Sequence, residues 1–352
     1  MSPGQPEGAG SIPAGLVFAD PAAPGITRTL NGSGWHYFGP DGKRITARDE
    51  VARLNAIALP PAYADAWFST RPNAHILAWG FDQRGRRQYR YHPDFRAGRD
   101  LRKFDLCARF GELLPVLRKR VSKDMASRRL TREKAVASVV ALLDTGKLRV
   151  GNECYVRDNK TFGATTLRMQ HVRLERGAMV LRFRAKNGAM REVRCSDRQL
   201  IRFVRRMQDL PGQHLFQYLG DGGEPVPIGS GDVNDYLHEV LGEEFTARNF
   251  RTWTASALAF EVLWEDRNAP LAMVLDTVSR CLGNTRTIAR KSYVHPLLIE
   301  AAKDRGLLDT LMPAALPRAT KWLTPAERGL LKFLEKANRP ARKTGTRKSS
   351  SR

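Results

Sequence analysis

The sequence predicts an α+β protein: a small β-rich N-terminal domain, and a larger, mainly α-helical domain that contains one β-hairpin. Three observations predict this class. Short apolar runs separated by turn residues extend to about residue 95, which is typical of strands. From about residue 101, apolar residues recur every three or four positions, as they do on helix faces. Residues 179–184 then alternate and are followed by Asn187-Gly188, a pair typical of hairpin turns.

The predicted domains follow from these changes in pattern. Residues 1–27 are rich in Gly and Pro and lack a hydrophobic period, which predicts a disordered leader. We expect the β-rich domain over residues 28–96, the helical domain over 97–315, and a C-terminal helix over 316–336. Residues 337–352 contain basic but no acidic residues, and they predict a disordered basic tail.

Several helices in the larger domain have recognisable ends. Thr131 and Gly146 bound one helix, and Pro115 is expected to open another at its first turn. Further helices are expected at about 196–208, 232–241, 246–264 and 269–282, with N-caps at Ser196, Asp232 and Thr246 and with Gly283 after the last helix.

The charge of the chain indicates a polyanionic partner. The 352 residues include 59 Lys and Arg against 36 Asp and Glu, a formal net charge of +23, and such an excess favours nucleic-acid binding. The four cysteines form no CxxC pair, which argues against a zinc site or a disulfide framework. No apolar run approaches the roughly 18 residues of a membrane span. We therefore expect a cytoplasmic protein that binds a polyanion and no membrane.

Residues 85–92, Gly-Arg-Arg-Gln-Tyr-Arg-Tyr-His, form a candidate DNA-contacting strand. On a strand, Gln88 and Arg90 face one way, and Tyr89 and Tyr91 face the other. A Gln side chain is suited to adenine edges, and Arg to phosphates or guanine. An ordinary exposed strand with its tyrosines turned inward fits the pattern equally well.

Arginines in the helical domain are further candidates. Arg149 lies between Leu148 and Val150, and this alternation turns its guanidinium inward, where it needs an anionic partner. A structural salt bridge is the alternative. Arg248 and Arg251 share one face of a predicted helix, for which a solvated basic face is the alternative.

A tyrosine near the end of the helical domain is a candidate nucleophile. Tyr293 follows Arg290 and Lys291 closely, and nearby cations lower the pKa of a phenol. The alternative is a packed aromatic residue just before Pro296.

Taken in order, Arg149, Lys186, Arg251, Asn284 and Tyr293 resemble the active-site series of type IB DNA topoisomerases, in the compact bacterial and poxvirus-like branch. The resemblance runs from about residue 34 to about residue 300. Its supporting motifs are Leu59-Pro60-Pro61-Ala62, 85–92, 148–155, 162–171, Phe250-Arg251-Thr252-Trp253, Leu282-Gly283-Asn284-Thr285 and Ser292-Tyr293-Val294-His295-Pro296.

The chain departs from the family pattern at a few positions. Ala185 stands where the family usually has glycine, Ala255-Ser256 where it has Gly-Thr, Arg286 where it has proline, and Arg248 where lysine is common. Asn284 occupies a position that holds histidine in the viral and nuclear branches. Asn still donates a hydrogen bond to a phosphoryl oxygen, but it is neither an acid nor a base near neutral pH.

The resemblance implies relaxation of supercoiled DNA without ATP, metal or any cofactor. Tyr293 would attack the phosphorus and form a 3′-phosphotyrosyl intermediate, while Lys186 would be the general acid for the leaving 5′-oxygen. The transition-state charge would be stabilised by Arg149, Arg251 and Asn284. The DNA-contacting residues would be Arg86, Arg87, Gln88, Tyr89, Tyr91 and Arg248. We expect a monomer that acts on double-stranded DNA in the bacterial nucleoid, with the N-terminal domain as part of a DNA clamp.

Three other classes compete with this interpretation. A tyrosine recombinase uses the same phosphotyrosyl chemistry, but Arg248 occupies the histidine position of the recombinase His-x-x-Arg pattern. A noncatalytic DNA-binding or architectural protein would not need the full series from Arg149 to Tyr293. A magnesium-dependent topoisomerase is disfavoured because the sequence has no Asp-x-Asp cluster to hold the metal.

Overall fold

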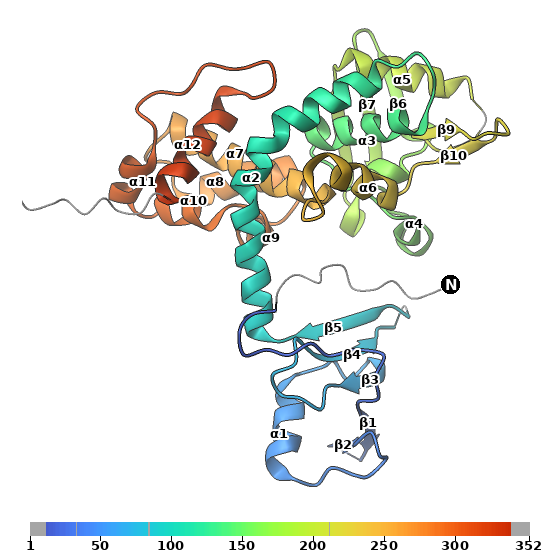
Figure 1. The fold of residues 1–352 in the computed structure, drawn as a ribbon, viewed down its shortest axis with the longest axis vertical. Helices are drawn as coiled ribbons and strands as arrows, with labels where there is room; N and C mark the ends of the chain where they lie inside the picture. The colour runs from blue at the N-terminus through green and yellow to red at the C-terminus, as the bar shows by residue number, and fades with distance from the viewer. Residues whose placement is uncertain (1–11, 33, 84, 211, 339–352) are drawn as a thin grey trace, which may run out of the picture. The chain divides into compact units, whose positions relative to one another are not determined.

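The computed structural model describes residues 12–32, 34–83, 85–210 and 212–338. The chain divides into two compact units, Met1–Lys103 and Phe104–Arg352 (Figure 1). The division lies beyond the predicted boundary at residue 96, and both positions fall inside helix α2 (Pro93–Met125).

The first unit contains a five-stranded antiparallel sheet, a short helix and the first part of α2. Its elements are β1 (Ile26–Asn31), β2 (Gly34–Phe38), α1 (Arg48–Ala56), β3 (Ala64–Phe68), β4 (Ile76–Phe81) and β5 (Arg87–Tyr91). The strand order is β2-β1-β3-β4-β5, so β5 lies at an edge. Leu54 of α1 packs with Tyr37 and Phe68 of the sheet in a core separate from that of the second unit.

The prediction of a disordered leader is wrong for residues 12–27, and residues 1–11 lie outside the described part of the chain. Val17 forms a parallel bridge with Ala74. The indole N–H groups of Trp67 and Trp79 donate to the carbonyl oxygens of Ala23 and Pro21, at 2.9 and 3.1 Å. A proline-rich segment lacks N–H donors but keeps its carbonyl acceptors, and buried indoles need such acceptors.

The second unit is mainly helical. Its helices are α3 (Arg132–Gly146), α4 (Glu153–Asn159), α5 (Arg198–Gln208), α6 (Ser230–Leu241), α7 (Ala247–Glu265), α8 (Leu271–Leu282), α9 (Arg286–Ser292), α10 (Pro296–Ala301), α11 (Arg305–Leu311) and α12 (Pro325–Asn338). Its strands are β6 (Val172–Glu175), β7 (Ala178–Arg184), β8 (Met190–Cys195), β9 (Gln217–Leu219) and β10 (Pro225–Pro227), in the sheets β6-β7-β8 and β10-β9.

Helix α3 lies at the centre of the second core, among α5, α6, α7 and β8 (Figure 1). Its side chains are apolar around most of the helix, and Ala135, Val139 and Leu143 are fully buried, as expected for a helix covered on all sides. The predicted α+β class, with a helical second domain interrupted by a hairpin, is confirmed. In the described residues, no helix is long and apolar enough to cross a membrane.

Pro115 does not open a helix, as the sequence had predicted, but lies inside α2. A proline removes one backbone hydrogen bond from a helix interior and usually kinks the helix or ends it. Here Phe110, Leu114, Leu117 and Val121 lie on both sides of Pro115 and are all buried in the core of the second unit. Packing of this continuous apolar face outweighs the local preference.

The predicted helix ends are correct at several positions. Thr131 and Thr246 are the N-cap residues of α3 and α7. Gly283 ends α8 with φ of +62°, the left-handed conformation that glycine adopts readily. At the end of α3 the left-handed residue is Lys147, with φ of +56°, and Gly146 is the last helical residue.

Two predicted N-caps are wrong. The cap of α5 is Asp197, whose side chain accepts the Leu200 N–H at 2.8 Å, rather than Ser196. A carboxylate at this position is also attracted by the positive end of the helix dipole. Asp232 lies in the first turn of α6, and its carboxylate accepts the N–H of Gly229, which is the actual N-cap residue.

The hairpin of β7 and β8 forms as predicted, with a longer connection than a two-residue turn. Asn187 and Gly188 both have positive φ, +69° and +78°, as the Asn-Gly pair indicates. The closing hydrogen bonds run from the Gly188 N–H to the Ala185 carbonyl and from the Ala185 N–H to the Ala189 carbonyl. Lys186 lies in this connection and is exposed.

The predicted C-terminal helix over residues 316–336 begins later, at Pro325. Thr324 and Glu327 form a reciprocal capping pair: the Glu327 N–H donates to the Thr324 hydroxyl, and the Thr324 N–H donates to the Glu327 carboxylate. This is the Ser/Thr-x-x-Glu signature of a helix start, which the sequence analysis missed. The predicted tail over 337–352 lies almost wholly outside the described residues, which end at residue 338 within α12.

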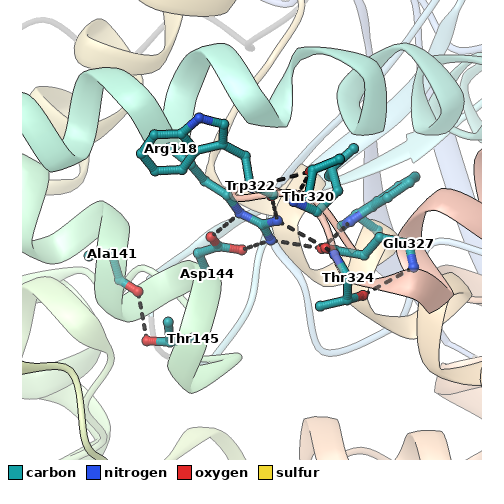
Figure 2. Close-up of polar contacts among 10 residues, drawn as sticks. Arg118, Ala141, Asp144, Thr145, Thr320, Trp322, Thr324 and Glu327 are labelled. Atoms are coloured by element: carbon teal, nitrogen blue, oxygen red, sulfur yellow. Dashed lines mark hydrogen bonds and ion pairs between the residues drawn. The ribbon is translucent and has the colours of Figure 1, made fainter. Parts of the chain in front are cut away.

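A buried charged network connects α12 with α2, α3 and α7. Figure 2 shows the Arg118 guanidinium between the Asp144 and Glu327 carboxylates, with N–O distances of 2.7 Å to each. Glu327 also accepts the indole N–H of Trp253 at 3.1 Å. Burial raises the pKa of Glu327, but Arg118 outweighs it and holds this pKa below its usual value. Because Trp253 is two residues from Arg251 on α7, the network supports the helix that carries a predicted site residue.

Candidate active site

Four of the five predicted catalytic residues come together in the second unit. Arg149 follows α3, Arg251 lies on α7, Asn284 follows α8, and Tyr293 is the residue directly after α9. The fifth, Lys186, lies in the β7–β8 connection, where it has no hydrogen bond or ion pair with any described residue.

Arg251 is the centre of this group. Its side chain is only 4% exposed. The guanidinium donates to the backbone carbonyls of Lys147 and Leu282, both at 2.9 Å, and to the Asn284 side-chain oxygen at 3.2 Å. Burial and the nearby Arg149 lower the pKa of Arg251 to about 10. The solvated basic face that was an alternative for this helix is therefore wrong for Arg251, although Arg248 is exposed.

Arg149 also binds the side-chain amide of Asn284. Its guanidinium donates to Asn284 Oδ1 at 2.6 Å, so the predicted inward orientation is correct, and Arg149 forms no salt bridge with any described residue. The segment is irregular rather than a strand. It pairs with residues 163–165, because Ala164 N–H donates to the Arg149 carbonyl at 2.8 Å. Gly151 and Gly163 permit this close approach, since a Cβ on Gly163 would lie 2.6 Å from Gly151 Cα.

Asn284 keeps one donor unused. Its Oδ1 accepts both arginines, while its Nδ2 is buried and has no hydrogen-bond partner among the described residues. A buried donor without an acceptor is unfavourable. An anion that brought an oxygen to Nδ2 would satisfy this donor.

Tyr293 lies against Arg251. The guanidinium carbon is 4.9 Å from the centre of the phenol ring, and the tyrosine is 9% exposed. Burial raises the pKa of Tyr293, but the charges of Arg251, Arg149 and Arg248 outweigh it, so the pKa lies below its ordinary value. The direction is the predicted one, but the causes are Arg251, Arg149 and Arg248 rather than the neighbouring Arg290 and Lys291. A lower pKa favours the phenolate form of a nucleophile.

Ser256 fixes the backbone around Tyr293. The Ser256 hydroxyl accepts the His295 N–H at 3.1 Å and lies 3.4 Å from the Tyr293 carbonyl oxygen. The Ala255-Ser256 departure from the family's Gly-Thr therefore preserves a hydroxyl at the position that contacts the tyrosine segment.

Arg191 is a member of this site that the sequence pattern did not indicate. It lies on β8, opposite Phe183, and its guanidinium donates to the Cys281 carbonyl at 2.5 Å. Burial and the charge of Arg149 lower the pKa of Arg191, which places it beside the cluster. The signal that selected Arg149, an arginine between two apolar residues, does not apply to Arg191, whose neighbours are Met190 and Glu192.

The cluster is positively charged without compensation. Among the described residues, no carboxylate forms an ion pair or hydrogen bond with Arg149, Arg191 or Arg251, whereas arginines elsewhere in the unit, such as Arg118 and Arg132, do pair with carboxylates. Nor do three or more His, Cys, Asp or Glu side chains gather as metal ligands in the described part of the chain. Buried cations need a partner, and the donors here suit a phosphodiester.

In the first unit, the predicted DNA-contacting residues lie on β5, except Arg86, which directly precedes it. The Tyr89 and Tyr91 rings stack with centroids 5.8 Å apart, and Arg87 lies over the Trp79 ring at 4.1 Å. The Gln88 amide and the Arg86 guanidinium both donate to the same Asp82 carboxylate oxygen, at 3.0 and 2.7 Å.

Comparisons with known proteins identify relatives of both units. The family model for the catalytic core of eukaryotic DNA topoisomerase I matches residues 92–303. The family model for the N-terminal domain of bacterial DNA topoisomerase IB matches residues 34–82.

Individual proteins are also similar. The DNA topoisomerase 1B of Acanthamoeba polyphaga mimivirus is 28% identical over 78% of this chain and 87% of its own length. The DNA topoisomerase 1B of Vaccinia virus (strain Copenhagen) is 21% identical over 67% of this chain and 75% of its own. A solved structure of XerH site-specific recombinase bound to palindromic difH substrate has 16% identity and a TM-score of 0.35, over 53% of this chain and 50% of that one.

Proposed function

This chain belongs to the DNA topoisomerase I family, whose catalytic-core model covers more than half of it, and we propose that the residues gathered around Asn284 form its active site. The protein is a type IB DNA topoisomerase, an isomerase that relaxes supercoiled DNA by transient cleavage of one strand. The observation that carries the proposed site is the convergence of Arg149 and Arg251 on Asn284, beside Tyr293, where no carboxylate of the described residues pairs with either arginine.

Tyr293 is the proposed nucleophile. Its phenolic oxygen forms a bond to the scissile phosphorus, the bond from phosphorus to the 5′-oxygen breaks, and the strand is held as a 3′-phosphotyrosyl ester. This ester retains the energy of the phosphodiester bond, so resealing by the 5′-hydroxyl needs no ATP. The arginines that lower the pKa of Tyr293 favour loss of its proton during the attack.

The arginines and Asn284 are the proposed stabilisers of the transition state. Negative charge develops on the nonbridging oxygens of the phosphorane, and fixed donors at these oxygens supply a large part of catalysis. Arg149 and Arg251 already converge at 2.6 and 3.2 Å on the Asn284 oxygen. The unused Nδ2 of Asn284 is the donor that a phosphoryl oxygen would accept from.

Lys186 is the proposed general acid. The leaving 5′-oxygen needs a proton, because an alkoxide is a poor leaving group. Lys186 is exposed in a hairpin connection and is not held by any hydrogen bond or ion pair with a described residue. Its ammonium group is therefore available to a bound DNA strand.

We also propose that β5 and the residue before it contact DNA, through Arg86, Arg87, Gln88, Tyr89 and Tyr91. Replacing Arg87 by Gln should weaken duplex binding and reduce the slope of log affinity against log salt by about 1 if it contacts one phosphate. Arg248 is proposed as a further phosphate contact of the second unit. An unchanged salt slope for both Arg87→Gln and Arg248→Gln would contradict these assignments.

We propose that the enzyme works as a monomer in the bacterial cytoplasm, on nucleoid DNA, since one chain carries all five catalytic residues. Light scattering of the purified protein, at the concentrations used for activity, would give the mass of one chain. A dimer would contradict this proposal.

Relaxation of a supercoiled plasmid in EDTA without nucleotide tests the proposed active site. Wild type and Tyr218→Phe should relax the plasmid, whereas Tyr293→Phe should bind DNA and leave it supercoiled. On a duplex whose 5′ leaving strand is too short to religate, only proteins with Tyr293 should become covalently attached. Covalent attachment by Tyr293→Phe would assign the nucleophile elsewhere.

A further inference from the structure

Arg191 faces the interior of the second unit from the hairpin that also carries Lys186. Along β8, Met190, Glu192 and Arg194 are exposed, while Arg191 and its alternate neighbour Val193 are less accessible. Arg191 pairs in register with Phe183, which is buried. Side chains on alternate positions of a strand face opposite sides, so Arg191 lies on the core side.

The guanidinium of Arg191 binds the end of α8. The last carbonyls of a helix lack backbone partners and carry its negative partial charge. Arg191 donates to the Cys281 carbonyl at 2.5 Å, and Arg251 donates to the next carbonyl, that of Leu282, at 2.9 Å. Two guanidinium groups from different elements, β8 and α7, therefore hold this helix end.

The same contact extends to the residue before Asn284. Gly283 has φ of +62°, and a Cβ placed on it would lie 2.5 Å from Arg191 Nη1. The guanidinium therefore fills the space beside this glycine and fixes the turn directly after α8. Asn284 follows that turn, and both Arg149 and Arg251 bind its side-chain oxygen.

We propose that Arg191 is a positioning residue for DNA cleavage, which holds the turn after α8 so that the Asn284 amide keeps its orientation toward the scissile phosphate. This inference rests on the function proposed above. Arg191 also connects two parts of the site: the hairpin with Lys186 and the turn with Asn284. A movement of the hairpin that brings Lys186 to the leaving oxygen would thereby be linked to the placement of Asn284.

The first test compares Arg191→Gln with Arg182→Gln. Arg182 is an exposed arginine on β7 of the same hairpin, so its replacement removes the same charge without touching α8. We expect Arg191→Gln to bind duplex DNA with unchanged affinity and to cleave it about 100-fold more slowly in single-turnover assays, the effect of a misplacement near 1 Å. Arg182→Gln should cleave at the wild-type rate. Equal cleavage rates for the two variants would overturn the proposal.

A double-mutant cycle shows whether Arg191 acts through Asn284. In an Asn284→Ala background the amide is absent, so Arg191→Gln should slow cleavage much less than it does in wild type. If the rate decrease of the double variant equals the product of the two single decreases, Arg191 does not act through Asn284 and the proposal is overturned.

If Arg191→Gln does not fold, Arg191→Lys replaces it in the test. The lysine ammonium group reaches the Cys281 carbonyl, but it does not also fill the space beside Gly283 that the second nitrogen of the guanidinium occupies. Arg191→Lys should cleave more slowly than Arg182→Gln, and an equal rate would again refute the proposal. Absence of cleavage by wild type itself would refute the proposed function instead.

Discussion

Replacing Arg118 by Met should strongly destabilise the second unit at neutral pH. The change keeps most of the aliphatic stem but removes the guanidinium between Asp144 and Glu327, each of which it binds at 2.7 Å. The two carboxylates are only 17% and 10% exposed, so they would remain as unpaired, mostly buried charges. Breaking a buried ion pair by removing one partner costs about 3–5 kcal/mol.

The pH dependence of this loss gives a second, independent check. In wild type the pKa of Glu327 is held below its usual value. Ionised Glu327 therefore stabilises the folded protein at pH values above the pKa that it has in the unfolded chain. This stabilisation is lost as the pH falls through its lower pKa in the folded protein. Without Arg118, burial is opposed only by the hydrogen bonds from the Thr324 and Trp253 N–H groups, so the pKa of this carboxyl is higher than in wild type. The difference in unfolding free energy between wild type and the variant therefore becomes smaller as the pH falls, because protonation of Glu327 removes the unpaired charge.

Urea unfolding followed by circular dichroism, at pH 7.5 and at pH 5, measures both effects. The matched control is Arg305→Met, since the pair of Arg305 with Asp309 is about half exposed on both sides; exposed pairs contribute about 0–1 kcal/mol. A loss for Arg118→Met no larger than that of the control would refute the reasoning. So would a loss that stays constant between the two pH values.

Three further predictions concern catalysis. Lys186→Ala should slow single-turnover cleavage by about 10²–10⁴-fold, and a substrate with sulfur at the 5′-bridging position should restore the rate, because a thiolate leaves without a proton; failure of this rescue would exclude Lys186 as the acid. Gly283→Ala should reduce cleavage by displacing Arg191 and straining a residue with positive φ, whereas Gly231→Ala, where a Cβ meets no neighbour, should be tolerated. Arg251→Lys should move the pH profile of cleavage, because Arg251 is the largest contributor to the lowered pKa of Tyr293 and a less closely placed cation lets that pKa rise; the rate should then increase at higher pH than in wild type, and an unshifted profile would contradict the assigned cause.

The sequence was most informative where local spacing alone determines the structure. The Asn187-Gly188 pair predicted a hairpin, and Thr131 and Gly283 predicted helix ends that the structure confirms. The convergence of Arg149 and Arg251 on Asn284 was expected only through the resemblance to a family, because three separate elements contribute the side chains.

The errors arose where distant contacts decide the outcome. Pro115 was expected to open a helix, but the buried side chains on both sides of it keep α2 continuous. The leader was expected to be disordered because of its composition, yet the indoles of Trp67 and Trp79 use its carbonyl oxygens. Arg191 was overlooked because the partner that gives it a role, the carbonyl of Cys281, is 90 residues away along the chain.

The network of Arg118 sets a lower limit on the smallest chain that keeps an intact catalytic region. All five proposed catalytic residues lie before residue 303, where the catalytic-core match ends. A protein truncated there would retain every one of them but would lose Glu327, leaving the Trp253 indole N–H without its acceptor and Arg118 without one of its two carboxylates. Minimal versions of this enzyme should therefore extend through α12, even though that helix contributes no group to the chemistry.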